Sequence, residues 1–326
     1  MDILNNAVIT YDCIKASVDV TEKELSDFSV EKGDILFQRS SETLEDVGRA
    51  NVYMDDKTAV FGGFVIRGKK KGEYDPQYFN YLLRSPFARK RIVPMGAGAQ
   101  HFNIGQEGLS KVNLHFANIK EQKKIGKMFS LLDERIATQN KIIERYESLI
   151  KGIAQNVAHN NKPNISLSEC LECSSSTLQE SDVCENGTYP VYGANGIVGY
   201  LDNYNTEKEA VYIIKDGSGV GAVSYVTGKC SATGTLNTLQ AKEGHSLQYL
   251  YYILKVFNFE PYKTGMAIPH IYFKDYGKAK IFCPPYQEQL RYAKMLSAID
   301  DKLLAEQNIL TNLSLLKQYL LRQMFI

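Results

Sequence analysis

Residues 119–157 read IKEQKKIGKMFSLLDERIATQNKIIERYESLIKGIAQNV, and this stretch decides the fold. Its apolar residues recur at alternating spacings of four and three, and nine of the ten positions in the stripe are apolar. The ten positions are Ile125, Phe129, Leu132, Ile136, Gln139, Ile143, Tyr146, Ile150, Ile153 and Val157. This spacing over more than four heptads predicts a long helix that packs lengthwise against a second helix.

The second helix is encoded later in the same chain, because the pattern returns about 167 residues downstream. The repeated landmarks are Glu121-Gln122 with Glu288-Gln289, and Asp133 with Asp300. The second stripe consists of Tyr292, Leu296, Ile299, Leu303, Glu306, Leu310, Leu313, Lys317, Leu320 and Met324. Two helices of one chain, each preceded by a β-rich stretch, predict a globule–helix–globule–helix order.

The polar positions of the stripes bear on how the helices pair. Gln139 is the polar member of the first stripe, and Glu306 is its counterpart in the second. In an antiparallel intramolecular pair these two side chains are expected to meet near the middle and to fix register. A parallel dimer of two chains would also place each polar residue opposite its equivalent in the other chain. A third interpretation is that both side chains simply reach solvent. Each stripe covers 33 residues, which is about 50 Å of helix. Globules at opposite ends of such a helix pair could contact neighbouring major grooves on one face of DNA, which are about 34 Å apart.

The expected fold class is α+β, with two mixed α/β domains separated by two long helices that pair as an antiparallel coiled coil. The expected boundaries are 1–118 for the first domain, 119–160 for the first helix, 161–285 for the second domain and 286–326 for the second helix. Strands are expected within 30–37, 59–66, 189–193 and 211–214, and helices over 75–91 and 247–257.

Composition narrows the class of protein. No apolar run approaches the 18 residues of a membrane span, and the six cysteines of this large chain read as reduced thiols, which predicts a cytoplasmic protein without membrane contact. The net charge is only +1, but residues 67–91 hold eight Lys/Arg against two acidic residues. Such a local patch attracts polyanions, although a solvated surface explains it equally well.

No catalytic constellation is apparent. The glycine-rich run at 217–221 lacks the Gly-Lys-Ser/Thr of a phosphate loop, so a tight hairpin is the favoured interpretation. Cys170 and Cys173 have no second Cys/His pair at zinc-finger spacing, so no metal site is predicted. Cys283-Pro284-Pro285-Tyr286 lacks the asparagine of the adenine-methyltransferase loop and is expected to be a turn. The chain is therefore not expected to be an enzyme by itself.

Taken in order, the motifs resemble those of the DNA-specificity subunit of type I restriction-modification systems over essentially the whole chain. The first half carries KGDILFQRSS at 32–41, AVFGGF at 59–64 and YLLRS at 81–85; the second carries YPVYGANGIVGY at 189–200 and KDGSGVG at 215–221. One departure concerns the opening of each domain: 30 residues precede Glu31, whereas about 44 precede its equivalent Glu207 in the second half. The first domain is therefore expected either to be abbreviated at its N-terminus or to begin at an internal start.

The resemblance implies two target-recognition domains that each read half of a split double-stranded DNA site, spaced by the antiparallel helices. It also implies docking of two methyltransferase subunits, joined by restriction subunits. S-adenosylmethionine, ATP and magnesium would then bind those partners and not this chain. The alternative is a degenerate or adaptor subunit that binds methyltransferase but reads DNA with only one domain; a free-standing methyltransferase or nuclease has little support.

Candidate DNA contacts are polar side chains on loops that flank strands. In the first domain they are Arg39, Ser40, Ser41, Arg49, Lys69, Lys70, Lys71 and His101. In the second they are Tyr192, Asn195, Lys215, Ser218, Thr233, Thr235, Asn237 and His270. The three lysines are equally well explained as solubilising charges. Off the main helix stripes lie Ile142, Leu149, Ile309 and Leu316, which either contact methyltransferase subunits or widen the seam between the helices.

Overall fold

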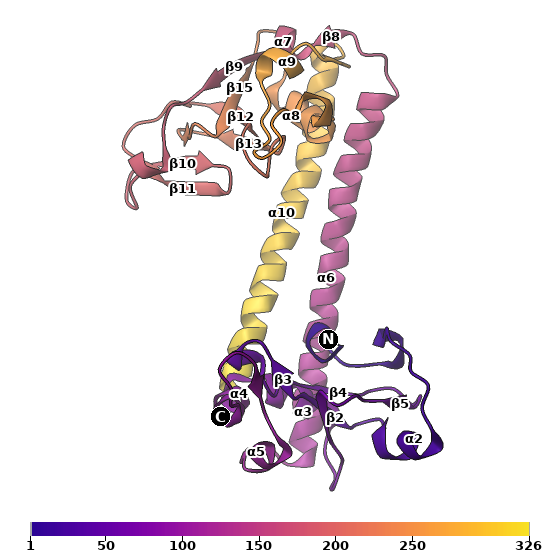
Figure 1. The fold of residues 1–326 in the computed structure, drawn as a ribbon. Coiled ribbons are helices and arrows are strands. Elements are labelled where there is room, and N and C mark those ends of the chain that lie inside the picture. The colour runs from indigo at the N-terminus through magenta and orange to yellow at the C-terminus, as the bar shows by residue number, and fades with distance from the viewer. Residues whose placement is uncertain (1, 326) are drawn as a thin grey trace. The chain divides into compact units, whose positions relative to one another are not determined.

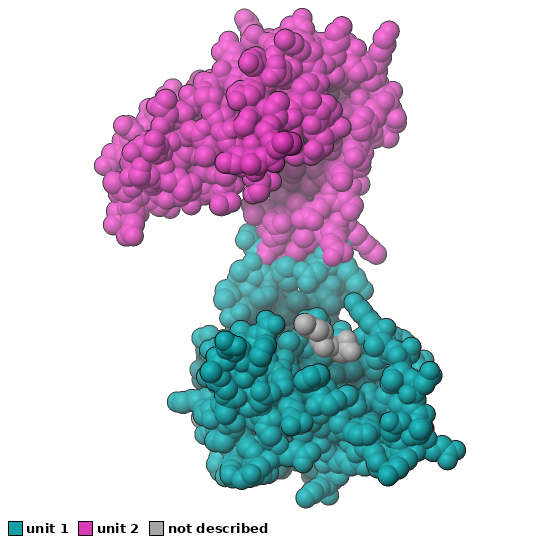
Figure 2. All heavy atoms as spheres, in the orientation of Figure 1, with its two compact units in different colours: residues 1–141, 308–326 teal, residues 142–307 magenta. Residues whose placement is uncertain are grey.

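The computed structural model describes residues 2–325, and the chain divides into two compact units (Figure 2). The first unit comprises residues 1–141 and 308–326, and the second comprises residues 142–307. Both long helices cross this division, so each unit contains a segment of each helix. The boundaries expected from the sequence separate globular from helical parts instead, and they stay predictions.

The two long helices are α6 (Ile119–His159) and α10 (Tyr286–Gln323), labelled in Figure 1. Asn118 caps α6, because its Oδ1 accepts hydrogen bonds from the backbone N–H groups of Lys120 and Glu121, both at 3.1 Å. Pro284 and Pro285 directly precede α10, where a missing N–H donor costs no helical hydrogen bond. Neither helix contains an internal proline, so both run without a break.

The helices pair in antiparallel fashion. In the first unit Phe325, just past the end of α10, stacks on Phe129 near the start of α6, with 5.8 Å between ring centroids. In the second unit Val157, near the end of α6, and Ala293, near the start of α10, share one hydrophobic core. The beginning of each helix therefore packs with the end of the other, as the sequence predicts.

The first unit is built on a three-stranded antiparallel sheet with strand order β4-β2-β6. The pairs β1 with β5 and β3 with β7 form two separate two-stranded sheets. Its strands are β1 (Ser29–Val30), β2 (Ile35–Gln38), β3 (Ser40–Ser41), β4 (Ala50–Val52), β5 (Ala59–Val60), β6 (Val65–Gly68) and β7 (Phe102–Asn103). Its shorter helices are α1 (Asp2–Asn5), η1 (Tyr11–Cys13), α2 (Glu22–Phe28), η2 (Leu44–Asp46), α3 (Pro76–Arg84), α4 (Pro86–Ile92), η3 (Val93–Met95) and α5 (Gln106–Ser110).

Two expected elements of the first unit are each split in two. The helix expected over 75–91 breaks at Ser85, because Pro86 disfavours helical geometry in the residue before it. Ser85 then caps α4, accepting a hydrogen bond from the backbone N–H of Ala88 at 3.3 Å. The strand expected over 59–66 becomes β5 and β6, which belong to different sheets, because a turn centred on Gly63 and Phe64 separates them.

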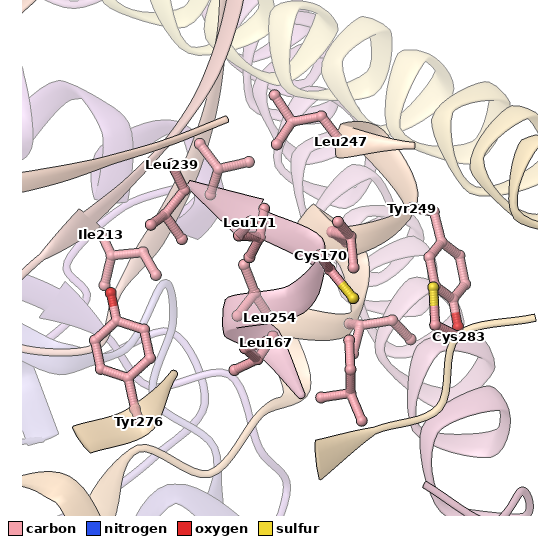
Figure 3. Close-up of a cluster of buried hydrophobic side chains, with 14 of the residues drawn as sticks. Leu167, Cys170, Leu171, Ile213, Leu239, Leu247, Tyr249, Leu254, Tyr276 and Cys283 are labelled. Atoms are coloured by element: carbon pink, nitrogen blue, oxygen red, sulfur yellow. The ribbon is translucent and has the colours of Figure 1, made fainter. Parts of the chain in front are cut away.

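The second unit holds a four-stranded sheet of order β13-β12-β15-β9 and a three-stranded sheet of order β11-β10-β14. Its strands are β8 (Ile165–Ser166), β9 (Leu171–Ser175), β10 (Tyr189–Gly193), β11 (Gly196–Leu201), β12 (Glu209–Ile214), β13 (Val223–Thr227), β14 (Ser231–Ala232), β15 (Leu236–Ala241) and β16 (Lys280–Ile281). Its shorter helices are α7 (Leu167–Cys170), η4 (Glu180–Asp182), α8 (Leu247–Val256), η5 (Glu260–Tyr262) and α9 (Phe273–Tyr276). Helix α8 packs on the four-stranded sheet, and the core between them includes Leu171, Ile213, Leu239 and Leu254 (Figure 3).

The sequence repeat has a structural cause, because each long helix is fastened to its globule by the same contacts. Tyr81 donates a hydrogen bond to Asp133 Oδ2 at 2.8 Å, and Tyr252 donates one to Asp300 Oδ2 at 2.7 Å. The repeated aspartates thus accept equivalent hydrogen bonds from a tyrosine of α3 and a tyrosine of α8. In the first unit Asp133 also forms an ion pair with Lys317 of α10.

Candidate DNA-recognition surface

In the first unit, the loop that follows β2 lies between two other loops. The backbone N–H of Arg39 donates to the carbonyl of Phe64 at 2.8 Å, and the carbonyl of Arg39 accepts from the N–H of Ile104 at 2.9 Å. Ser40 and Ser41 pair with Asn103 and Phe102 of β7. The loop after β2, the turn before β6 and the loop around His101 therefore converge at one end of the sheet.

The second unit repeats this arrangement after β12. The N–H of Lys215 donates to the carbonyl of Thr235 at 3.0 Å, and its carbonyl accepts from the N–H of Ile271 at 2.9 Å. The next residues are tied to the same neighbour, because the N–H of Gly217 donates to Pro269 at 3.0 Å. Lys215, Ser218, Thr235 and His270 therefore converge on one edge of the unit, where Ser218 is exposed.

Arg39 and Lys215 are structural equivalents. Each follows the second strand of its sheet, donates its N–H to a neighbouring loop and accepts from an isoleucine just past a hairpin. Ile104 and Ile271, the two isoleucines, are 167 residues apart, which is the period of the sequence repeat. The repeat thus places one cationic side chain at the same position in each unit, a correspondence that the sequence motifs do not reveal.

A tight hairpin stands beside each cation. The two hairpins close with antiparallel bridges, between Ala97 and Asn103 and between Thr264 and His270. Gly98 and Gly265 follow the first bridge residue with φ of +145° and +88°, and a Cβ there would lie 2.0 and 2.3 Å from a carbonyl oxygen across the turn. Only glycine fits this backbone. The two histidines lie in equivalent hairpins but at different positions, because Asn103 and not His101 corresponds to His270.

Apolar side chains at these loop ends were missed in the sequence. Phe64 is 77% exposed in the turn before β6, and Met266 and Ile268 protrude from the second hairpin, Met266 completely. The sequence does indicate their exposure, because a large apolar residue beside a glycine in a tight turn lies at the surface and cannot pack into the core. These side chains widen each candidate surface beyond the polar residues.

Other predicted contacts lie elsewhere in their unit. Lys69, Lys70 and Lys71 are exposed but follow β6 at the end of the sheet opposite Arg39, since Gly68 pairs with Ile35 and Val65 with Gln38. Arg49 is at the Arg39 end, where it forms an ion pair with Asp46 at 2.7 Å and lines a cavity of about 590 Å³ together with Arg84 and Arg89. The lysines therefore do not extend the surface around Arg39.

In the second unit, Tyr192 and Asn195 belong to the β10–β11 hairpin, with Asn195 exposed in its turn. The carbonyl of Tyr192 accepts from the N–H of Thr233 at 2.9 Å, which joins this hairpin to the loop that contacts Lys215. The Tyr192 ring packs against Tyr212 at 5.7 Å, and burial raises the pKa of its hydroxyl.

Thr233 and Asn237 are buried, at 1% and 4% exposure, unlike the other candidates. Asn237 accepts a hydrogen bond from Ser175 at 2.9 Å and donates one to Tyr276 at 3.3 Å, so its amide holds β9, β15 and α9 together. The hydroxyl groups of Thr233 and Thr235 form a hydrogen bond, with 2.8 Å between their oxygen atoms. Both have structural partners, and their predicted DNA contact would require the loop to open.

On the helices, Gln139 is fully buried in the first unit, whereas Glu306 is partly exposed in the second. Their pairing stays a prediction, because the two side chains belong to different units.

The candidate partner-binding residues of the helices are mostly exposed. Leu149, Ile309 and Leu316 are 40–47% exposed and Ile142 is half-buried, so three of these four present apolar surface to solvent. Leu304, Leu315 and Tyr319, which the sequence analysis did not single out, are 57–60% exposed. Among the described helices, none combines the length and apolar character needed to cross a membrane.

Two units of related construction, each with a cation-bearing loop cluster and a segment of both antiparallel helices, define a protein built on an internal structural repeat. The family model for the type I restriction modification DNA specificity domain matches residues 1–148 and 164–314. The chain therefore belongs to this family, which confirms the resemblance recognised in the sequence.

Individual proteins agree with this assignment. The chain is 29% identical over 123 residues to a putative type I restriction enzyme specificity subunit of Haemophilus influenzae, a match that covers 37% of this chain and 32% of that protein. It is 25% identical over 277 residues to a putative type I specificity subunit of Mycoplasma genitalium, covering 78% of this chain and 71% of that protein. The crystal structure of a type I restriction-modification system S subunit from M. genitalium superposes with a TM-score of 0.64 at 20% identity, covering 92% of this chain and 84% of that one. At that identity the likeness shows a shared fold.

Proposed function

We propose that this chain is the DNA-recognition subunit of a type I restriction-modification complex, in which each unit reads one half of a split site. The observation that carries the proposal is the equivalence of Arg39 and Lys215, each held at the meeting point of three loops. Cationic and hydroxyl side chains on such loops suit contacts to phosphates and base edges. The two clusters are independent in sequence, so each half-site has its own set of reading residues.

The partners in this proposal are two methyltransferase subunits, with restriction subunits completing the complex. The chain would supply recognition and no catalysis, while S-adenosylmethionine, ATP and magnesium bind to the partner subunits. Exposed apolar residues on the long helices, including Leu149, Leu304 and Leu316, support docking of other subunits, because an isolated soluble helix pair has no reason to expose them. We place the assembled complex in the cytoplasm.

The test uses the chain coexpressed with its methyltransferase subunits, and base-resolution methylome sequencing reads the site. The expected motif consists of two short blocks separated by unread base pairs. Arg39→Ala and Lys215→Ala should each lower methylation about tenfold or more, since a good base contact contributes ~1–3 kcal/mol. Lys23→Ala and Lys162→Ala, which remove exposed cations elsewhere in the two units, are the controls and should leave methylation unchanged.

A continuous motif, or none, would contradict the proposal. The adaptor alternative gives a different pattern, in which Arg39→Ala leaves the methylated motif unchanged and Lys215→Ala alone abolishes it. The presence of the Arg39 loop cluster in the first unit favours two working readers, because a degenerate unit would have no need to keep it.

A further inference from the structure

Three potential metal ligands from separate parts of the second unit meet in the core beside α10. Cys170 is the last residue of α7, His245 lies in the loop between β15 and α8, and Cys283 precedes the turn into α10. Their ligand atoms all lie within 4.8 Å of one another. Figure 3 shows Cys170 and Cys283 with their sulfur atoms close to Tyr249. Spacing in the sequence could not reveal this group, because a search for local Cys/His pairs links Cys170 to Cys173.

The two sulfur atoms are shielded from solvent, whereas the imidazole is accessible. Cys170 is fully buried, Cys283 is 8% exposed and His245 is partly exposed. The two sulfur atoms lie within 4.8 Å of each other. A cation reaching this point from the His245 side would therefore meet two sulfur ligands in a protected position.

The hydrogen bond of His245 is compatible with metal binding through its other ring nitrogen. Its Nδ1 lies 3.1 Å from the carbonyl oxygen of Glu243, which can only accept, so Nδ1 carries the proton and donates. The lone pair of Nε2 is then free for a metal. Histidines that bind metals in proteins use this arrangement, in which the second nitrogen donates to a backbone carbonyl.

The backbone holds the cysteines in place without a metal. Asn164 clamps Cys283, accepting from its N–H and donating to its carbonyl, both at 2.8 Å. The carbonyl of Cys170 accepts from the N–H of Lys242 at 2.9 Å, which ties α7 to the segment that carries His245. Such support from surrounding hydrogen bonds is what a precise metal site requires.

We propose that Cys170, His245 and Cys283 bind a zinc ion, with solvent as the fourth ligand on the His245 side. Two thiolates and one imidazole favour zinc over hard cations such as magnesium or calcium. Binding releases the thiol protons to solvent and joins three segments: the start of the four-stranded sheet, the loop before α8 and the entry to α10. The ion would fasten α10 to the globule of the second unit. Within residues 2–325, this is the one cluster of three or more His, Cys, Asp or Glu side chains that could hold a metal ion. The first half has Phe116 at the position that corresponds to Cys283, so the site is not part of the internal repeat.

The test is zinc content of the full chain, purified without chelators and measured by plasma mass spectrometry. The expected result is about one zinc per chain, and a cobalt-substituted sample should show thiolate-to-cobalt charge-transfer absorption. His245→Ala removes a partly exposed ligand, so the fold should persist while zinc affinity falls ~10-fold or more. Cys283→Ser should abolish the cobalt–thiolate spectrum, and Cys184→Ser, at an exposed cysteine outside the group, is the matched control.

Protein that takes up no zinc after reconstitution with zinc salt would overturn the proposal. A Cys170–Cys283 disulfide found by mass spectrometry in protein isolated under reducing conditions would also overturn the proposal. So would a Cys184→Ser variant that loses as much zinc as Cys283→Ser. Circular dichroism on each variant separates loss of the metal from loss of the fold, because His245→Ala must remain folded for its lower affinity to count.

Discussion

The side chain of Gln289 on α10 accepts a hydrogen bond from the backbone N–H of Ser246 at 2.8 Å, at the position that caps α8. The same amide donates to the carbonyl of Pro284 at 2.8 Å. In the first unit Gln122 makes the matching pair of contacts, accepting from Asp75, the cap of α3, at 2.9 Å and donating to Ala117 at 2.7 Å. The repeated glutamine thus fixes the first turn of each long helix to the cap of a globular helix.

Replacing either glutamine by alanine should destabilise its unit. Both glutamines are only 2% exposed. Gln289→Ala leaves a buried N–H and a buried carbonyl without this partner, and Gln122→Ala does the same to a part-buried N–H and a part-buried carbonyl. Each change should lower the free energy of unfolding by ~1–3 kcal/mol. Urea titration of the full chain measures this. Gln287→Ala, at an exposed glutamine two residues before Gln289, should change the free energy by less than ~0.5 kcal/mol. Equal effects for Gln287 and Gln289 would contradict the clamp.

These clamps also explain how far the sequence could predict the structure. The alternating spacing between Ile125 and Val157 predicts α6 because a stripe of that length has few other solutions, and α10 follows in the same way. The sequence shows that the Glu-Gln pair is repeated, but it does not show which groups the glutamines bind, because tertiary packing determines the hydrogen-bond partners of a glutamine. Pro86 was a readable signal that the prediction of one helix over 75–91 overlooked.

The candidate site could be predicted less completely than the fold. Arg39, Lys215 and Ser218 follow strands in sequence, and the structure leaves them at loop junctions. Asn237 has the same polar character but lies inside, because alternation along β15 turns its amide toward Tyr276. Which side of a strand faces the core depends on the sheet it joins, and that information is non-local.

Alkaline pH should unfold the protein through its buried tyrosines. Burial, reinforced by the hydrogen bond to and charge of Asp300, raises the pKa of Tyr252, and burial likewise raises the pKa of Tyr249 and Tyr276. Unfolded tyrosine titrates near pH ~10. Above that pH the unfolded chain loses protons that the folded chain retains, so stability is intact below ~10 and falls as the pH rises further.

Unfolding free energies measured on either side of pH ~10, together with tyrosinate absorbance, check this behaviour. Tyr252→Phe should cost ~1.5–3 kcal/mol at neutral pH, because it removes a hydrogen bond to a carboxylate, and should reduce the alkaline loss. Tyr319→Phe, at a tyrosine that is 60% exposed, should alter neither quantity. A stability that stays constant well above pH ~10 would contradict the assignment.

The two hairpin glycines should be intolerant of any side chain. Gly98→Ala or Gly265→Ala would place a Cβ against a backbone oxygen at positive φ, so the hairpin must rearrange. The strain is ~1–3 kcal/mol, and DNA recognition by the corresponding unit should weaken, as methylome sequencing of the assembled complex would reveal. Gly152→Ala is the control: it lies in α6 with no atom within 4 Å of an added Cβ, and it should stabilise the chain by ~1 kcal/mol. If Gly98→Ala behaved like Gly152→Ala, the hairpin geometry would be wrong.

The apolar residues on the outer faces of the helices should matter for assembly and little for folding. Leu316→Lys and Leu149→Lys change side chains that are each 47% exposed, so the free energy of unfolding should move by less than ~1 kcal/mol. In the proposed complex the same changes should weaken binding of methyltransferase subunits about tenfold or more, because a lysine ammonium would be buried without a partner. Size-exclusion chromatography with light scattering measures the complex, and urea titration measures the chain alone. Leu296→Lys is the opposite control: at 2% exposure it should unfold the chain. Intact assembly with both exposed-site variants would mean that the partners dock elsewhere, leaving the outer faces of α6 and α10 without this role.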